Sequence, residues 1–164
     1  MIQSRSISPK GTRAVLSIDF DGVLHSLASA YAIDDSRLPR EQLLAAGQFC
    51  HCQALEDLLN SHEPVDLLVH SSWRLACSVA RIRELIGPLG HRLRGITPVG
   101  TVDREASILE ILRRWQVPTA RAVVLDDQAF YFRMLSASLV LCPEQDGFPA
   151  VQRELDEALK RATG

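Results

Sequence analysis

The sequence predicts an α/β protein of three layers, in which a central, mainly parallel sheet carries helices on both faces. Short apolar runs of strand length alternate along the chain with segments whose apolar residues recur at helical spacing. Acidic or hydroxyl residues follow directly after several of these runs, as expected where parallel strands end at a ligand-binding edge. Together these observations indicate a Rossmann-like fold.

The expected strands share a short apolar run bounded by turn or charged residues, and they lie at residues 14–20, 65–70, 94–99, 122–125 and 139–141. The expected helices share apolar residues at three- and four-residue spacing, and they lie at residues 53–61, 75–86, 104–115, 129–136 and 151–161. Residues 22–47 form a long connection of mixed composition, and connections of that length are usually functional or disordered.

Composition predicts one soluble domain over residues 1–164, with a loose leader at residues 1–12. The chain is 46% hydrophobic and 23% charged, and its net charge of −2 gives no argument for nucleic-acid binding. The apolar runs are far shorter than the roughly 20 residues that cross a bilayer, so we expect no membrane partner. The polar start lacks the apolar core of a signal peptide, which favours a cytoplasmic protein.

Four cysteines are too few to predict a disulfide framework in a chain of this size. The segment Cys50-His51-Cys52 lacks the usual spacing of zinc ligands, and we interpret its cysteines as buried helix residues.

Two carboxylates one residue apart, Asp19 and Asp21, end the first apolar run. Strand geometry directs side chains at i and i+2 to the same face, so the two should project together. Their repulsion favours a bound cation, and Mg²⁺ prefers such oxygen ligands. Ser71 and Asp126 also follow expected strands, so all four residues should meet at one edge of the sheet.

A serine pair, Ser71 and Ser72, closes the expected strand at residues 65–70. A hydroxyl and backbone N–H groups at such a strand–helix junction can hold phosphate oxygens, and either serine can instead cap the following helix. Register favours Ser71 as the phosphate ligand.

The segment Asp19-Phe20-Asp21-Gly22-Val23-Leu24 resembles the first motif of the haloacid dehalogenase (HAD) superfamily, whose members are mostly Mg²⁺-dependent phosphatases. Three further motifs of that superfamily follow in order: Ser71 after a strand, Arg104 at a helix start, and Asp126-Asp127 after a strand. The segments Ser71-Ser72-Trp73-Arg74, Gly95-Ile96-Thr97-Pro98 and Leu125-Asp126-Asp127 resemble more closely the HAD-like domains of Swiss-army-knife RNA repair proteins.

The resemblance implies a HAD-like fold with a small cap or none, because residues 25–47 offer room for a flap but not for a full cap domain. It also implies Asp19 as nucleophile and Asp21 as the acid and base that serves the leaving oxygen and the attacking water. Mg²⁺ would be held by Asp19, the Asp21 backbone carbonyl and one of Asp126 and Asp127, of which Asp126 is favoured.

Phosphate would be bound by Ser71 or Ser72 and by Arg104. Arg74 would either clamp the substrate or pair with a carboxylate. The expected substrate is a phosphomonoester, either a small molecule or a large one such as a nucleic-acid end. Two alternatives stay open: an inactive binding module on the same fold, and a phospho-acceptor domain resembling response-regulator receivers.

Overall fold

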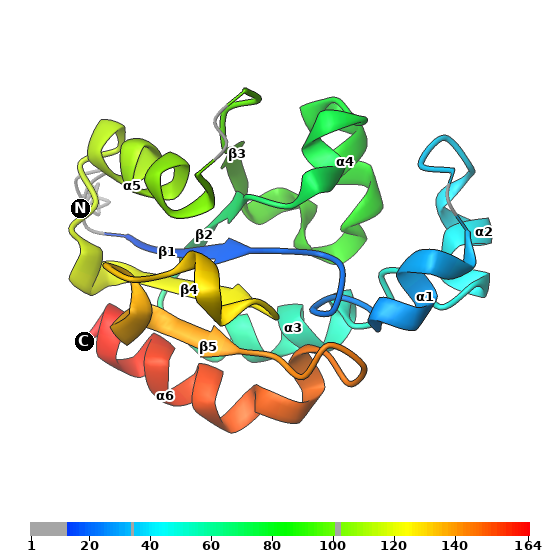
Figure 1. Ribbon diagram of the computed structural model, residues 1–164. Helices are drawn as coiled ribbons and strands as arrows, with labels where there is room; N and C mark the ends of the chain where they lie inside the picture. The colour runs from blue at the N-terminus through cyan, green and yellow to red at the C-terminus, as the bar shows by residue number, and fades with distance from the viewer. Residues whose placement is uncertain (1–12, 34, 101–102) are drawn as a thin grey trace, which may run out of the picture.

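The computed structural model describes residues 13–33, 35–100 and 103–164, so the predicted leader at residues 1–12 lies outside the described part. Five parallel strands form one sheet in the order β3-β2-β1-β4-β5 (Figure 1). These strands are β1 (Ala14–Ile18), β2 (Val65–Val69), β3 (Leu93–Ile96), β4 (Ala122–Asp126) and β5 (Leu139–Leu141). The predicted three-layer α/β fold class is confirmed.

The α-helices are α1 (Leu27–Ala32), α2 (Arg40–Ala45), α3 (Cys52–Leu59), α4 (Val79–Leu85), α5 (Arg104–Arg114) and α6 (Gln152–Thr163). Short 3₁₀ helices connect them: η1 (Ser72–Leu75), η2 (Gly87–Arg92), η3 (Thr119–Arg121), η4 (Ala129–Tyr131), η5 (Ser136–Ser138) and η6 (Phe148–Val151).

Alternate residues of β1 face two different apolar clusters, because successive side chains of a strand point to opposite faces. Leu16 and Ile18 belong to the larger cluster, which contains residues of α3, α4 and α6. Val15 belongs to the smaller cluster with residues of α5, including Ile108. Every β1 residue is buried, so helices cover both faces of the sheet.

Strand register brings the carboxyl ends of three strands to the same level. Ile18 of β1 pairs with Val69 of β2 on one side and with Leu125 of β4 on the other. The next residues along each strand direction, Asp19, His70 and Asp126, therefore lie side by side at this edge. The sheet thus presents two carboxylates and an imidazole near the topological switch point, which lies between β1 and β4.

The insertion between β1 and α3 contains two short helices, α1 and α2, which lie beyond the end of the sheet to which the strands point (Figure 1). The Arg40 Nε donates to the carbonyl of Leu85 in α4 at 3.0 Å, and Arg81 of α4 donates to the carbonyls of Ser36 and Leu38. The insertion is much smaller than a domain, as expected for a minimal cap. Its action as a flap stays a prediction.

Two expected helices are wrong in detail. The helix predicted at 75–86 is divided, because the Ser78 hydroxyl accepts from the Arg81 N–H at 3.1 Å and so caps a new helix, α4. The segment 129–136 is a loop with the 3₁₀ turns η4 and η5 at its ends. The buried Glu105 carboxylate accepts the N–H groups of three consecutive residues of this loop, which removes the need for helical hydrogen bonds there.

Candidate active site

Three of the predicted charged residues meet at the carboxyl ends of β1 and β4. Arg104, the first residue of α5, places its Nη1 3.1 Å from the Asp19 Oδ2 and 2.7 Å from the Asp126 Oδ2. Asp19 is 6% exposed and Asp126 is fully buried. The cation thus bridges two carboxylates that come from neighbouring strands, and the face of Tyr131 lies 4.4 Å from its guanidinium.

Both carboxylates are buried, but their pKa values are shifted in opposite directions. Burial raises the pKa of Asp19, as does nearby Asp126, and the charges of His70 and Arg104 offset this only in part. Burial also disfavours the charged form of Asp126, but hydrogen bonds from His70 and Arg104 outweigh it and leave the pKa of that carboxyl below its ordinary value. Asp126 is therefore held as a carboxylate by its two donors.

Asp127 joins these residues from the other side. Each of Asp19, Asp126 and Asp127 contributes one carboxylate oxygen, and these three oxygens lie within 4.8 Å of one another. Burial and, to a smaller extent, the charges of Asp19 and Asp126 together raise the pKa of Asp127 to about 7. Gly22 makes room for this carboxylate, since a Cβ there would lie 2.3 Å from the Asp127 Oδ2.

This donor set fits a hard divalent cation. All three ligand atoms are carboxylate oxygens. Burial is the main cause of the raised pKa of Asp127, but repulsion from Asp19 and Asp126 adds to it, and a positive ion would relieve that repulsion. The Asp21 side chain does not belong to this cluster in the described part of the chain. Its predicted role as a ligand rests on its backbone carbonyl and stays a prediction.

The Asp21 carboxylate is held by two donors at a single oxygen. The His25 Nε2 lies 2.8 Å and the Trp73 Nε1 2.9 Å from the Asp21 Oδ1. The Phe49 N–H donates to the His25 Nδ1 at 3.1 Å, so the proton of a neutral His25 is on Nε2, which donates to Asp21. Burial raises the pKa of Asp21, but these hydrogen bonds leave it below its ordinary value.

The predicted phosphate-binding residues lie around this edge in different ways. The Ser71 side chain is fully buried and accepts from the Trp73 N–H at 3.3 Å, so it caps η1, whereas Ser72 is exposed. The Arg74 Nη1 donates to the carbonyls of His70 and Ser71 at 3.3 and 3.0 Å. In the described part of the chain Arg74 pairs with no carboxylate, so of its two predicted roles the substrate clamp is the one that stays open.

Sequence reasoning missed the two buried histidines that support the aspartates. The His70 Nε2 lies 2.8 Å from the Asp126 Oδ2, and the His70 Nδ1 lies 2.7 Å from the Ser17 hydroxyl. His70 could have been found as the polar end of an apolar strand, in register with Asp19. No sequence pattern identifies His25, because its hydrogen bonds with Asp21 and with the Phe49 N–H depend on the conformation of the loop after β1.

The cysteine interpretation is half wrong. Cys52 is buried in α3, but Cys50 precedes that helix and is exposed. The residue before Cys50, Phe49, is 1% exposed and belongs to the larger apolar cluster.

A parallel sheet of this order, with an acidic cluster and a bridging cation at the ends of β1 and β4, has the architecture expected of a HAD-type domain. The chain belongs to the family described as HAD domain in Swiss Army Knife RNA repair proteins, whose model matches residues 15–152. The family resemblance stated from the sequence is thus confirmed.

No curated protein and no solved structure matches the chain. Within residues 13–33, 35–100 and 103–164, none of the helices combines the length and apolar character that crossing a bilayer requires. The cytoplasmic location stays a prediction.

Proposed function

We propose that this chain is a Mg²⁺-dependent phosphomonoesterase that works through an aspartyl-phosphate on Asp19. The observation that carries the proposal is the meeting of Asp19, Asp126 and Asp127 within 4.8 Å, with Arg104 bridging two of them. This arrangement supplies a nucleophile, carboxylate ligands for a cation and a fixed positive charge at one sheet edge.

The reaction has two displacement steps at phosphorus. A carboxylate oxygen of Asp19 attacks the phosphorus, the bond to the leaving oxygen breaks, and Asp21 gives that oxygen a proton. Asp21 then removes a proton from water, which attacks the phosphorus and releases inorganic phosphate and free Asp19. The Asp21 Oδ1 is occupied by His25 and Trp73, so Oδ2 is the oxygen that exchanges the proton.

Positive charge around the transferring phosphoryl group comes from several sources. Bound Mg²⁺, held by Asp19, Asp126 and Asp127 with the Asp21 carbonyl, would neutralise developing charge on the phosphoryl oxygens. Arg104 is fixed at the same point by two carboxylates, and its pKa is raised because the charges of Asp19 and Asp126 outweigh burial. Ser71 or Ser72 and Arg74 follow β2 and are the proposed ligands of the outer phosphate oxygens.

The proposed substrate is a phosphorylated small molecule or nucleic-acid end. An insertion with only two short α-helices would leave room for a large ligand at the carboxyl edge, and the family's name refers to RNA repair proteins. Both features support a nucleic-acid end without excluding a small ester.

The test is hydrolysis of an aryl phosphate by the purified protein with Mg²⁺. We expect EDTA to abolish the activity and Asp19→Asn to lower kcat by about three orders of magnitude or more, because the nucleophile is lost. Asp57→Asn, on the exposed face of α3, is the matched control and should retain full activity. Full activity in Asp19→Asn would overturn the assignment of the nucleophile.

The same preparation separates the two alternative functions. Tight Mg²⁺ binding without turnover of any phosphoester would favour an inactive binding module. A phosphoprotein that persists for many minutes after exposure to a phosphoryl donor would favour a receiver-like acceptor domain.

A further inference from the structure

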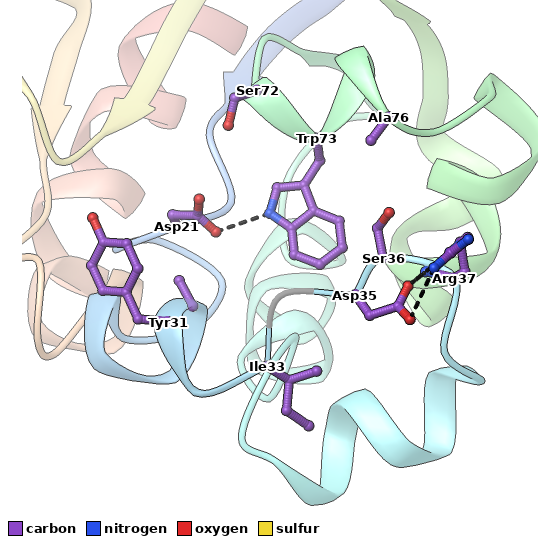
Figure 2. Close-up of a pocket in the computed structure, with 10 residues that line it drawn as sticks. Asp21, Tyr31, Ile33, Asp35, Ser36, Arg37, Ser72, Trp73 and Ala76 are labelled. Atoms are coloured by element: carbon purple, nitrogen blue, oxygen red, sulfur yellow. Dashed lines mark hydrogen bonds and ion pairs between the residues drawn. The ribbon is translucent and has the colours of Figure 1, made fainter.

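A cavity of about 680 Å³ opens directly beside Asp21 (Figure 2). Its volume lies in the range of sites for small organic ligands. Residues of the α1 segment and the loop after it form one side, and residues of η1, including Ser72 and Trp73, form the other. Asp21 therefore lines this cavity, and it lies two residues along the chain from Asp19 of the acidic cluster.

Trp73 gives the cavity a flat wall that cannot easily move. Its ring packs edge-on against Phe49, with ring centroids 5.0 Å apart, and its centroid lies 6.4 Å from that of the Phe20 ring. Its Nε1–H is fixed on Asp21, while part of the ring stays exposed to the cavity. A side chain held in this way loses little conformational entropy when a ring stacks on it.

Tyr31 supplies a second aromatic ring to the same cavity. It is 79% exposed, although exposed aromatic side chains give up the favourable burial of their rings. In Figure 2, Tyr31 and Trp73 are drawn on either side of Asp21. A flat group in the cavity would thus meet one aromatic residue from each side of the opening.

The charges of the cavity favour a neutral occupant. Among its described lining residues Arg37 is the one cation, and its Nε lies 3.1 Å from the Asp35 Oδ1. Asp21 and Asp35 both contribute negative charge to the lining. The one cation among the described lining residues is therefore already paired with a carboxylate, which disfavours a second phosphate, whereas groups such as Ser36 offer hydrogen bonds to polar ring atoms.

We propose that this cavity is the leaving-group subsite of the enzyme and that Trp73 and Tyr31 hold the base of a nucleoside monophosphate or of a terminal nucleotide. This inference rests on the proposed function, because Asp21 protonates the leaving oxygen and so fixes where the leaving group extends. Aromatic stacking accepts any base, so the subsite selects a nucleoside without reading its identity.

Fluorescence of Trp73 tests binding independently of turnover. The chain has two tryptophans, so Trp115→Phe leaves Trp73 as the reporter, and Asp19→Asn prevents consumption of the ligand. We expect adenosine and adenosine 5′-monophosphate to quench the emission, and ribose 5-phosphate, which lacks a base, to leave it unchanged. Adenosine diphosphate should bind no more tightly than the monophosphate.

Tyr31→Ala is the diagnostic variant, because this exposed residue contributes little to folding. It should weaken nucleoside binding about 5- to 100-fold and lower kcat/KM for the nucleotide equally, without changing kcat/KM for ribose 5-phosphate. Met134→Ala is the matched control, since Met134 is 77% exposed but does not line the cavity. An equal effect of Met134→Ala would overturn the assignment to this cavity.

The outcomes separate the two proposals. Phosphatase activity without nucleoside binding up to about 10 mM would overturn the subsite and leave the proposed function intact. Nucleoside binding that depends on Tyr31, in a protein without phosphatase activity, would overturn the proposed function and keep the binding site. A short oligonucleotide with a terminal phosphate distinguishes the two sources of the base, since it should bind more tightly than the mononucleotide if a strand end is the natural ligand.

Discussion

Gly22 is the residue that allows the two acidic segments to approach. Its φ of +74° lies in the left-handed region, which residues with a Cβ rarely adopt. Its missing side chain also leaves the space in which the Asp127 carboxylate lies. One glycine thus serves both the turn after Asp21 and the position of a proposed metal ligand.

We expect Gly22→Ala to weaken Mg²⁺ binding and to destabilise the fold, because the new Cβ displaces Asp127. Gly100→Ala is the matched control: Gly100 has a φ of +103°, but no atom of the described residues lies within 4 Å of the point that its Cβ would occupy. Backbone strain alone should cost the control about 1–2 kcal/mol, and Gly22→Ala should cost more than this. Urea unfolding and calorimetric titration with Mg²⁺ measure both effects. Unchanged Mg²⁺ affinity in Gly22→Ala would remove Asp127 from the set of ligands.

At the scale of single residues, the sequence predicts the side-chain proximities that follow from strand register alone. Asp19 and Asp126 could be placed together because each follows an apolar run, and parallel strands end at the same edge. The hydrogen bonds from His25 and Trp73 to Asp21 could not be predicted, since they depend on how a loop and a 3₁₀ helix pack.

Helix α5 positions more than Arg104. Its second residue, Glu105, is buried and accepts hydrogen bonds from the N–H groups of Arg133, Met134 and Leu135 at 2.7, 3.0 and 3.2 Å. These bonds connect the start of α5 to the loop after β4. That loop also carries Tyr131, whose ring covers the Arg104 guanidinium. The helix and the loop therefore hold the cation of the site from two sides.

Glu105→Gln should lower the free energy of unfolding by about 1–3 kcal/mol, because an amide NH₂ would face backbone donors where a carboxylate oxygen accepted them. The control is Glu110→Gln on the same helix, where a partly exposed carboxylate pairs with Arg114 on the surface. That change should cost about 0.5 kcal/mol or less. Chemical unfolding of the three proteins gives the comparison, and equal stabilities for the two variants would contradict the role of Glu105.

At the scale of elements, these same hydrogen bonds explain why the strands could be predicted and residues 129–136 could not. Apolar runs identify buried parallel strands from local sequence, since both faces of such strands are covered. Residues 129–136 also show a helical pattern, but the carboxylate of Glu105, about 30 residues earlier in the chain, accepts hydrogen bonds from their backbone N–H groups. The local sequence gives no sign of this long-range interaction.

Across the whole molecule, charged groups gather at both ends of the sheet with different consequences. At the carboxyl ends, oxygens of three carboxylates lie within 4.8 Å of one another, and one arginine bridges two of them. Towards the amino ends, the buried Glu56 of α3 is paired with two basic side chains, with Arg92 Nε 2.7 Å and His91 Nε2 2.8 Å from its oxygens. Arg92 also donates to Asn60 at 2.8 Å. The first arrangement suits ligand binding, whereas the second connects α3 to η2 and stabilises the fold.

The Glu56 cluster makes stability depend on acid pH in a predictable direction. Burial raises the pKa of Glu56, but the hydrogen bonds from Arg92 and His91 outweigh it and leave the pKa below the ordinary value of 4.5. The folded state thus binds a proton less readily than the unfolded state, so the stabilisation is fully present above pH 4.5 and is lost as the pH falls through the folded pKa.

The wild-type protein should therefore exceed Glu56→Gln in free energy of unfolding by a constant amount near neutral pH, and the difference should shrink in acid. Urea unfolding between about pH 3 and pH 7 measures it. Glu154→Gln on the exposed face of α6 should follow the wild-type curve, and a Glu56→Gln difference that persists undiminished at the acid end would show that the charge of Glu56 is not what stabilises this side of the protein.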